Sequence, residues 1–212
     1  FLPKPVAGVN GNGMHTNLSL SKEGKNVFFD GKGQDGLSEK AWNFINRILA
    51  NANDVCLILN SSVNSYRRLD PHFEAPNQIK VSPSDRGSMI RIPIGNERTA
   101  RIEVRSIAPD ANPYLAIYSL FKTGLEGPGN GDDNDGKRQR TRFLPDNIYD
   151  AIRLFKGSKW SQEILGEQVH EKFAELKAMQ ADRCPKALGA RVKRAEIQFH
   201  HEVTNQHLWS QF

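Results

Sequence analysis

The chain has 212 residues, of which 38% are hydrophobic and 25% are charged, and its formal net charge is +5. This composition is ordinary for a globular protein and excludes a chain that is disordered throughout. The positive charge is mild and both signs are interspersed, so the balance favours anionic small molecules at least as much as nucleic acid. The charge alone therefore selects no partner. Nucleic acid is not among the partners that we expect.

The cysteine content and the hydrophobic runs indicate where the protein works. Cys56 and Cys184 are the only cysteines and lie far apart, which excludes a disulfide framework and a thiolate zinc site. No apolar run approaches the length of a membrane span, so we expect a cytoplasmic protein with no membrane partner. Residues 1–5 contain neither a starting Met nor a signal-like apolar core, and we expect a piece of a longer protein.

The first predicted strand lies at residues 14–20, where side chains alternate. His15, Asn17 and Ser19 share one face, which predicts a strand with a polar working face. A shorter strand is predicted at 27–29, ending in a turn. Ser38 is then predicted to cap a helix whose apolar face carries Ala41, Trp42, Ile45, Ile48 and Leu49.

The middle of the chain combines an apolar run, a polar loop and two further strands. Periodicity cannot assign residues 55–59 to strand or helix, and residues 64–76 are predicted to form a loop. Strands are predicted at 88–93 and 101–105. In the second of these, two arginines and a glutamate alternate with Ile102 and Val104, so the charged face must meet water, a partner or a ligand.

The last part of the chain is predicted to be helical. A buried helix begins at Asn112-Pro113, and a surface loop follows at 123–143. From residue 144 to 212 we predict helices, one beginning at 145–146 and ending at Gly157, one with an apolar stripe and a last one over 197–208. The stripe comprises Val169, Phe173 and Leu176. The fold class is thus α+β: an antiparallel sheet with packed helices, a strand-rich first half (1–122) and a helical C-terminal half.

Three motifs suggest functions for which a structural explanation is favoured. The glycines of 8–13 follow a G-x-x-G-x-G order that is not the dinucleotide fingerprint, so a turn between strands is favoured. The segment HHEVTNQH (200–207) has Asn205 where a zincin has its second histidine, which favours surface histidines. The basic run 137–142 lacks the aromatic residues that stack on bases.

Arginines are unusually dense between residues 67 and 105, and several of them lie on predicted strands. Guanidinium groups bind carboxylates and phosphates in a bidentate manner and stay charged when partly desolvated. The region therefore indicates a site that handles several anionic groups.

Four ordered blocks identify a family. KPVAGVNGNGMHTNLS (4–19) resembles the ATP-binding signature of glutamine synthetases, and three later segments resemble that family's next blocks, in the expected order. They are NSYRRLDPHFEAP (64–76), DRGSMIRIP (85–93) and RIEVRSIAPDANPYL (101–115). The resemblance implies the C-terminal part of a catalytic domain that ligates ammonia to glutamate with ATP through γ-glutamyl phosphate, assisted by Mg²⁺ or Mn²⁺.

The resemblance also implies a role for each matching residue. His15 and Glu103 would bind the metal, whereas glutamate would be held by Asn10, Gly11, Arg68 and Arg105. Arg86 would face the transferring phosphoryl group, and Glu74 would close over the ammonium site. The nucleotide would be contacted by Ser19, Arg91, Arg98 and Arg101. Asn17 stands where many relatives have a second histidine, and Arg98 where a lysine is common, so the nucleotide end is expected to differ in detail.

Several alternatives share these residues. A relative that ligates glutamate to an amine or polyamine would need the same ATP and glutamate contacts, and a catalytically retired structural relative is a further alternative. The resemblance implies that the remaining metal carboxylates precede Phe1 and that the full-length parent is a ring-shaped homo-oligomer. The fragment alone is then expected to be inactive. The segment 147–150 resembles the modified tyrosine segment of some bacterial members, although a capped helix start is favoured.

Overall fold

A computed structural model describes residues 1–6, 8–129 and 141–198 of the chain, with residues 183–198 described by their backbone alone. Six strands form a four-stranded sheet in the order β1-β6-β5-β4 and a separate β2-β3 hairpin. The strands are β1 (Thr16–Leu18), β2 (Ser21–Lys22), β3 (Lys25–Asn26), β4 (Gln78–Ser82), β5 (Ser88–Arg91) and β6 (Ile102–Val104). The helices are η1 (Gln34–Gly36), α1 (Glu39–Ala50), α2 (Ala52–Leu59), α3 (Val63–Arg68), α4 (Pro113–Glu126), α5 (Ile148–Gly157), α6 (Lys159–Leu165) and α7 (Glu167–Gln198).

The predicted α+β class is confirmed, but the sheet is mixed and not antiparallel throughout. β6 is antiparallel to both β1 and β5, whereas β4 and β5 are parallel. Residues 83–87 are long enough to return along β4 to its beginning, where the Gln78 N–H donates to the Gly87 carbonyl at 3.0 Å. Asp85 fixes this return, because its carboxylate accepts from the Gly87 N–H at 2.8 Å and pairs with Lys80 at 2.6 Å.

Every strand of the described residues lies in the first half, as predicted, but helices share that half. The undecided run 55–59 belongs to α2, and all of its side chains are buried, which explains why it shows no amphipathic period. α3 occupies the beginning of the segment predicted as a loop. Its start is fixed by Ser62, whose side chain accepts from the Ser65 N–H at 3.1 Å.

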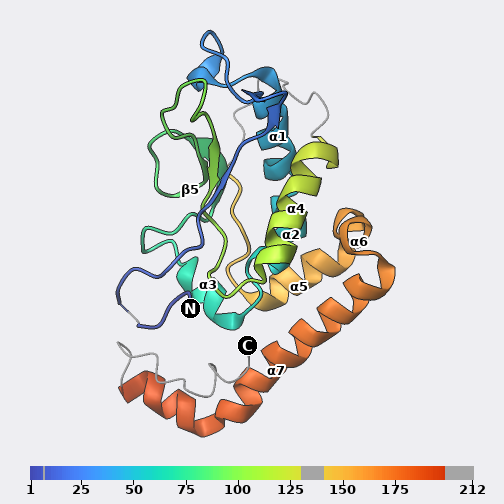
Figure 1. Cartoon of the computed structure of the whole chain (residues 1–212). Coiled ribbons are helices and arrows are strands. Elements are labelled where there is room, and N and C mark those ends of the chain that lie inside the picture. The colour runs from blue at the N-terminus through green and yellow to red at the C-terminus, as the bar shows by residue number, and fades with distance from the viewer. Residues whose placement is uncertain (7, 130–140, 199–212) are drawn as a thin grey trace.

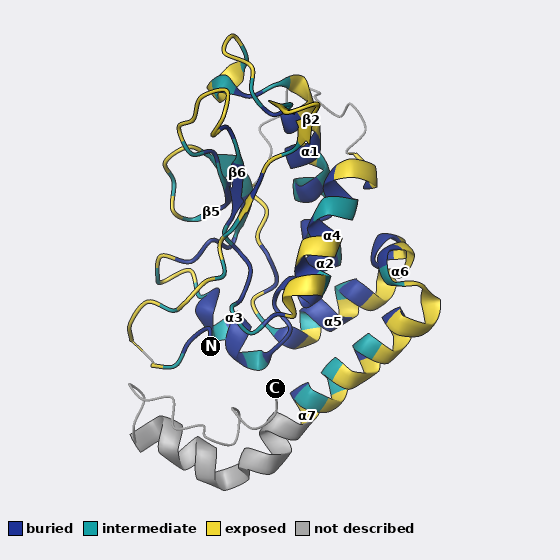
Figure 2. Ribbon diagram, in the orientation of Figure 1, coloured by how far each residue is buried: buried dark blue, intermediate teal, exposed yellow. Residues whose placement is uncertain are grey.

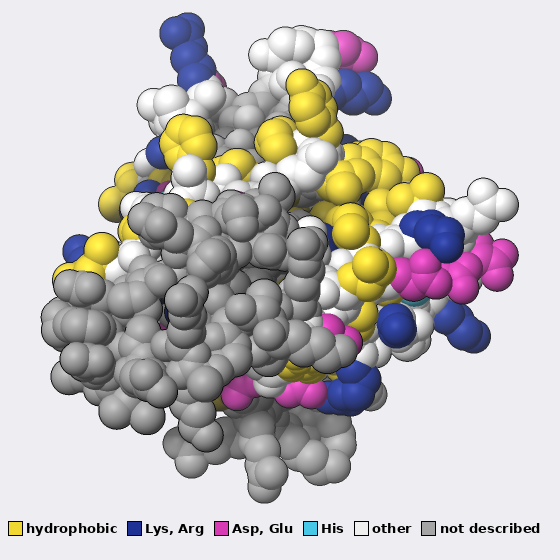
Figure 3. Space-filling view, turned by 90° about the horizontal axis from the view of Figure 1, so that it is seen from below, with side chains coloured by type: hydrophobic (Ala, Val, Ile, Leu, Met, Phe, Trp, Pro, Cys, Tyr) yellow, Lys and Arg dark blue, Asp and Glu magenta, His cyan; other side chains and the backbone are white. Residues whose placement is uncertain are grey.

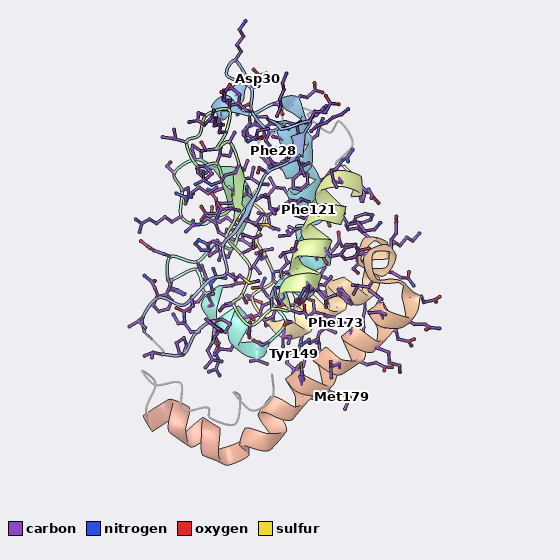
Figure 4. All side chains as sticks on the ribbon, in the orientation of Figure 1. Phe28, Asp30, Phe121, Tyr149, Phe173 and Met179 are labelled. Carbon is purple, nitrogen blue, oxygen red and sulfur yellow. The ribbon has the colours of Figure 1, made fainter. Side chains whose placement is uncertain are left out.

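The strand predicted at 27–29 does not form. The Asn26 side chain accepts from the Phe28 N–H at 2.9 Å and turns the backbone, so only an isolated bridge between Phe29 and Leu37 remains. Phe28 instead points into the core, where its ring lies 5.4 Å from the ring of Phe44 (Figure 4). The apolar run 27–29 therefore reflects the core contact of Phe28 and not a strand.

Helix starts agree closely with the capping residues in the sequence. The Ser38 hydroxyl accepts from the Ala41 N–H at 3.3 Å, and Asn112 accepts from the N–H groups of residues 114 and 115. Asn147 accepts from the Asp150 N–H at 2.9 Å, so the capped helix start favoured for 147–150 is confirmed. α5 ends at Gly157 as predicted, whereas α4 extends to Glu126.

The core lies between the sheet and the helices on one of its sides (Figures 1 and 2). α1 packs against α4. The contact is close because Gly124 of α4 has no side chain, and the Phe44 ring of α1 occupies the space where a Cβ would lie. Phe121 adds an edge contact to the same ring at 6.3 Å. The opposite side of the sheet has no such helical cover among the described residues, which leaves it free for a site.

α5 and α6 pack on α2, and α7 packs on α5 and α6. On α7 the predicted stripe is wrong at two of three positions. Val169 and Leu176 are about half exposed, and only Phe173 packs against the core. Among residues 167–182, whose side chains the structure describes, the buried ones are His170, Ala174 and Ala181. Alanines allow α7 to approach α5 closely, and the His170 ring stacks on Phe155 at 4.3 Å.

Some sequence expectations fall outside the described residues. They are the histidine-rich segment 200–207, the basic run at 137–140 and the predicted last helix beyond Gln198. No helix in the described part of the chain is both long and apolar enough to cross a membrane. On the face shown in Figure 3, the described basic and acidic side chains are interspersed and form no large patch of one charge.

Candidate active site

The pairing of three strands gathers the charged residues on the uncovered side of the sheet. Glu103 of β6 lies opposite Asn17 of β1 on one side and opposite Arg91 of β5 on the other. The predicted alternation of this strand is confirmed, because the neighbouring Ile102 and Val104 are fully buried on the helical side.

The carboxylate of Glu103 lies at the centre of this face. Its side chain is only 6% exposed, and one oxygen lies 2.9 Å from His15 Nδ1. The other oxygen accepts from Arg91 Nε at 2.9 Å and also contacts Arg91 Nη2, while Arg105 Nε lies 3.6 Å from the first oxygen. A buried carboxylate is tolerated only with such partners, because an unpaired one would cost several kcal/mol.

The electrostatics of His15 suit cation binding. Burial lowers the pKa of His15 below its ordinary value of 6.5, and the charge of Arg105 lowers it further, against the opposing effect of Glu103. The imidazole is therefore mostly neutral at pH 7 and keeps a lone pair for a metal ion.

The donor set of this cluster is incomplete by itself. Among the described residues no group of three or more His, Cys, Asp or Glu side chains is placed to hold a metal. Hard divalent cations take about six ligands, mostly oxygen. His15 and Glu103 therefore fit two positions around such a cation, and the others would come from phosphate oxygens, water or further residues of the protein.

Arg105 lies at the edge of this cluster, where its Nε faces the Glu103 carboxylate at 3.6 Å. Its Nη1 donates to the Arg86 carbonyl at 2.7 Å, and its side chain is only 12% exposed. Its Nε atom is buried and makes no hydrogen bond among the described residues. Glu103 compensates the charge of this guanidinium without accepting a hydrogen bond from Nε, so Arg105 keeps hydrogen-bonding capacity for an anionic ligand.

Arg68, matched above to a glutamate contact, lies deeper in the protein. Its guanidinium donates to three backbone carbonyls, those of Arg105, Ser106 and Ile107, at 2.8–3.2 Å. Burial lowers the pKa of Arg68 to about 10, with Arg105 as the second cause. Arg68 thus fixes the backbone that follows β6. Its guanidinium is buried and directs these donors to the backbone and not to solvent.

The glycine-rich loop 8–13 packs directly on Arg68. A Cβ at Gly11 would overlap the Pro3 carbonyl, and one at Gly13 would overlap the Arg68 guanidinium. Asn10 lies between these glycines and the segment 70–76, because its side-chain oxygen accepts from the Glu74 N–H at 3.4 Å. The loop therefore lies beside both Arg68 and the Glu74 segment.

Glu74 and Arg86 form a pair at the exposed edge of the site. One guanidinium nitrogen of Arg86 lies 2.8 Å from both carboxylate oxygens of Glu74. The Arg86 side chain is 70% exposed and the Glu74 side chain is 54% exposed. Since the Arg86 carbonyl also accepts from Arg105, this pair is linked to the Glu103 cluster through the backbone.

A cavity of about 780 Å³ lies beside the β2-β3 hairpin. It brings Ser19 and Arg98 together, two of the four residues matched to nucleotide contacts. The other two lie on the sheet face, Arg91 at Glu103 and Arg101 with its Nε donating to Asn17 Oδ1 at 3.0 Å.

Sequence reasoning missed part of this cavity wall. Leu20, Asn26 and Phe29 also line it, and Asn26 is held by its side-chain donation to the Ala100 carbonyl at 2.7 Å. A signal was present in the sequence, since Gly24 is a residue type that tight hairpin turns favour. In the structure Glu23 and Gly24 have the positive φ angles of such a turn.

Comparisons with known proteins agree with this arrangement. Residues 1–200 match the family model described as "Glutamine synthetase, catalytic domain". The chain belongs to the glutamine synthetase family. A glutamine synthetase of Methanosarcina mazei is 40% identical over 196 residues, which are 86% of this chain and 44% of the relative. Glutamine synthetases of Clostridium saccharobutylicum and Staphylococcus aureus are 35% and 36% identical over equal shares.

A solved glutamine synthetase-like structure, titled "Apo GmaS without ligand", has the same fold. It superposes with a TM-score of 0.74 and 31% sequence identity, over 93% of this chain and 47% of that chain. The chain thus spans less than half the length of these glutamine synthetase relatives.

Proposed function

We propose that the full-length protein ligates ammonia to glutamate with ATP, by way of γ-glutamyl phosphate. The observation that carries this proposal is the Glu103 cluster: a buried carboxylate held between His15, Arg91 and Arg105 on a sheet face of a glutamine synthetase family member. A retired relative would gain nothing from keeping this desolvated charge.

The cluster suits phosphoryl transfer to a carboxylate, in which two anions must approach each other. Positioning and charge neutralisation account for most of the catalysis in such reactions. Arg105 would bind a glutamate carboxylate through its guanidinium, whose Nε makes no hydrogen bond, and Arg91 would turn toward the transferring phosphate. Mg²⁺ or Mn²⁺ bound by His15 and Glu103 would supply further positive charge to the nucleotide phosphates.

The nucleotide itself would occupy the cavity beside the hairpin. Leu20 and Phe29 offer an apolar wall for the base, whereas Lys25 and Arg98 offer positive charge. A cavity of about 780 Å³ is within the range of small-molecule sites. Arg101 would complete the contacts between this cavity and the sheet face.

The acceptor would bind at the exposed edge. Glu74 would attract an ammonium ion and take its proton, so that neutral ammonia attacks the acyl phosphate, while Arg86 faces the phosphate. Asn10 and Gly11 would hold glutamate beside them, since Asn10 already contacts the Glu74 segment.

An amine or polyamine acceptor is the second candidate. The Glu74 carboxylate is 54% exposed, so this edge is accessible to an acceptor larger than ammonia. The ATP and glutamate residues would be the same in both reactions.

An ADP-coupled assay decides between these candidates. The full-length protein is supplied with ATP, Mg²⁺ and glutamate, and then with ammonia, ethylamine or spermidine. We expect the highest kcat/KM with ammonia. A preference for an amine of tenfold or more would establish the second candidate, and no ADP release with any acceptor would refute both.

The same proposal includes the cellular compartment and the oligomeric state of the full-length protein. We expect the full-length protein to be a cytoplasmic, ring-shaped homo-oligomer, which analytical ultracentrifugation would test. The 212-residue chain alone should be inactive and should bind Mn²⁺ weakly, because its described part supplies two ligands. Submicromolar Mn²⁺ affinity of this chain in calorimetry would contradict that expectation.

A further inference from the structure

Lys4 is buried to an extent that is unusual for a lysine. The residue is 4% exposed and stands between two prolines. Its backbone is held on both sides by the side chain of Asn64 in α3, which accepts from the Lys4 N–H at 2.6 Å and donates to the Lys4 carbonyl at 3.0 Å. Asn64 is itself fully buried, so the position of this lysine is set by the core.

The ammonium group of Lys4 joins two different segments. It donates to the Val9 carbonyl in the glycine-rich loop, and it lies 3.4 Å from the ring centroid of Phe73. A cation over an aromatic face is attracted to the ring quadrupole, and the attraction grows when the pair is desolvated. No carboxylate among the described residues forms an ion pair with this ammonium.

The residues before Lys4 strengthen the attachment to the glycine-rich loop. The Pro3 carbonyl accepts from the Asn12 N–H at 2.7 Å, and the Leu2 carbonyl accepts from the Asn12 side chain at 2.9 Å. Residues 2–4 therefore hold the glycine-rich loop at Val9 and at Asn12, on either side of Asn10 and Gly11. Phe73, the ring under the ammonium, directly precedes Glu74.

We propose that Lys4 is a positioning residue that fixes the distance between the glycine-rich loop (8–13) and the Glu74 segment (70–76). The inference rests on the proposed function, because these two segments carry the groups assigned to glutamate and to the acceptor. Lys4 touches no reactant. It acts through the Val9 carbonyl and the Phe73 ring, and it keeps the glutamate carboxylate and the Glu74 carboxylate at the spacing that the transfer needs.

The first experiment separates loop coupling from catalysis. Hydrogen exchange is measured by mass spectrometry on the full-length wild type and on Lys4→Met, which keeps the apolar stem and removes the charge. Peptides covering 8–13 and 70–76 should both exchange at least about threefold faster in the variant. Lys172→Met, on the exposed face of α7, is the matched control and should change neither peptide. Faster exchange in only one of the two segments, or in neither, would overturn the coupling.

The second experiment measures what the coupling does. In steady-state kinetics Lys4→Met should raise KM for glutamate about tenfold and leave KM for ATP within twofold. Phe73→Leu should do the same, and Phe73→Tyr, which keeps the ring face, should stay within about threefold of wild type. Equal rises for both substrates, or no difference between the Leu and Tyr variants, would overturn the positioning role.

The two failures remain distinguishable. If the wild-type protein releases no ADP in the presence of glutamate, the proposed function fails, whereas the exchange experiment still decides whether Lys4 couples the two segments. If Lys4→Met does not fold, the Phe73 pair of variants tests the same contact from the other side, because both keep a large apolar side chain at that position.

Discussion

The site contains two carboxylate–arginine pairs that differ in almost every physical respect. Glu103 lies on a central strand, is 6% exposed and contacts His15 just before β1, Arg91 of β5 and Arg105 just after β6. Glu74 lies on a loop segment, is 54% exposed and has Arg86 as its ion-pair partner. The strands fix the first carboxylate in place, whereas the second can move with its loop.

This difference suits the two carboxylates to different roles in the proposed reaction. Groups that neutralise phosphate charge must be in place before the reactants meet, because reorganising them during the reaction would add to the barrier. A group that admits an acceptor must open and close. The comparison therefore predicts that changes at Glu103 alter stability and activity together, while changes at Glu74 alter activity alone.

The largest expected effect is that of Glu103→Gln in the full-length protein. Glutamine keeps the shape but leaves Arg91 and Arg105 without a compensating charge. Breaking a buried pair in this way costs about 3–5 kcal/mol, which is roughly a thousandfold in rate if it falls on the transition state. We expect that loss in the ADP-coupled assay together with a lower melting temperature.

Glu175→Gln on α7, which removes one partner of an exposed pair, is the control for this substitution. It should leave both measurements unchanged. Activity of the Glu103→Gln protein within about tenfold of wild type would remove Glu103 from the site.

Glu74→Gln tests the other half of the comparison. An exposed ion pair contributes about 0–1 kcal/mol, so the melting temperature should stay nearly constant. Loss of a proton acceptor should lower kcat with ammonia about a hundredfold. A drop in melting temperature as large as that of Glu103→Gln would show that the loop pair is structural, and the comparison would then fail.

Arg105→Lys sharpens the role of the buried cluster. A lysine cannot donate to the Arg86 carbonyl and to a ligand with the fixed geometry of a guanidinium. KM for glutamate should rise about tenfold while KM for ATP changes little. Arg153→Lys, on the exposed side of α5, is the control. Equal effects on both substrates would place Arg105 outside the glutamate site.

The smallest expected effect concerns pH and the loop segment. The His72 N–H lowers the pKa of Asp70 below its ordinary 3.8 against the opposing effect of burial, and the His72 side chain and the Lys4 charge lower it further. Because the folded state holds this carboxylate ionised at lower pH, its stabilisation is present above about pH 4 and is lost as pH falls through the folded pKa.

Thermal unfolding of the wild type and of Asp70→Asn at several pH values measures this contribution. The wild type should be slightly more stable at pH 6, and the difference should shrink below pH 3.8 and vanish once the pH is below the folded pKa of Asp70. A difference that grows on acidification would contradict the direction of the shift.

Much of the scaffold could be predicted because its signals are local. Ser38, Asn112 and Asn147 mark helix starts through hydrogen bonds to N–H groups two or three residues ahead. The alternation around Glu103 likewise follows from the period of a strand, which placed the charged cluster on one face.

The remainder depends on contacts between distant segments. No local pattern indicates that residues 83–87 turn back and make β4 and β5 parallel. Nor does one indicate that the Arg68 guanidinium donates its hydrogen bonds to backbone carbonyls. The predicted stripe of α7 failed because packing favoured small side chains and a stacked histidine over the larger apolar residues. The side chains that α7 buries are therefore determined by the helix on which it packs and not by its own apolar pattern.

The glycines that crowd Arg68 bear on the thermodynamics of ligand binding. A loop with several glycines is usually costly to order, because glycine loses more backbone entropy than other residues. Here the Arg68 guanidinium and the Pro3 carbonyl leave Gly11 and Gly13 room for no side chain, so the protein orders the loop when it folds. A substrate that binds there meets a preorganised surface, and the entropic penalty of binding is correspondingly small.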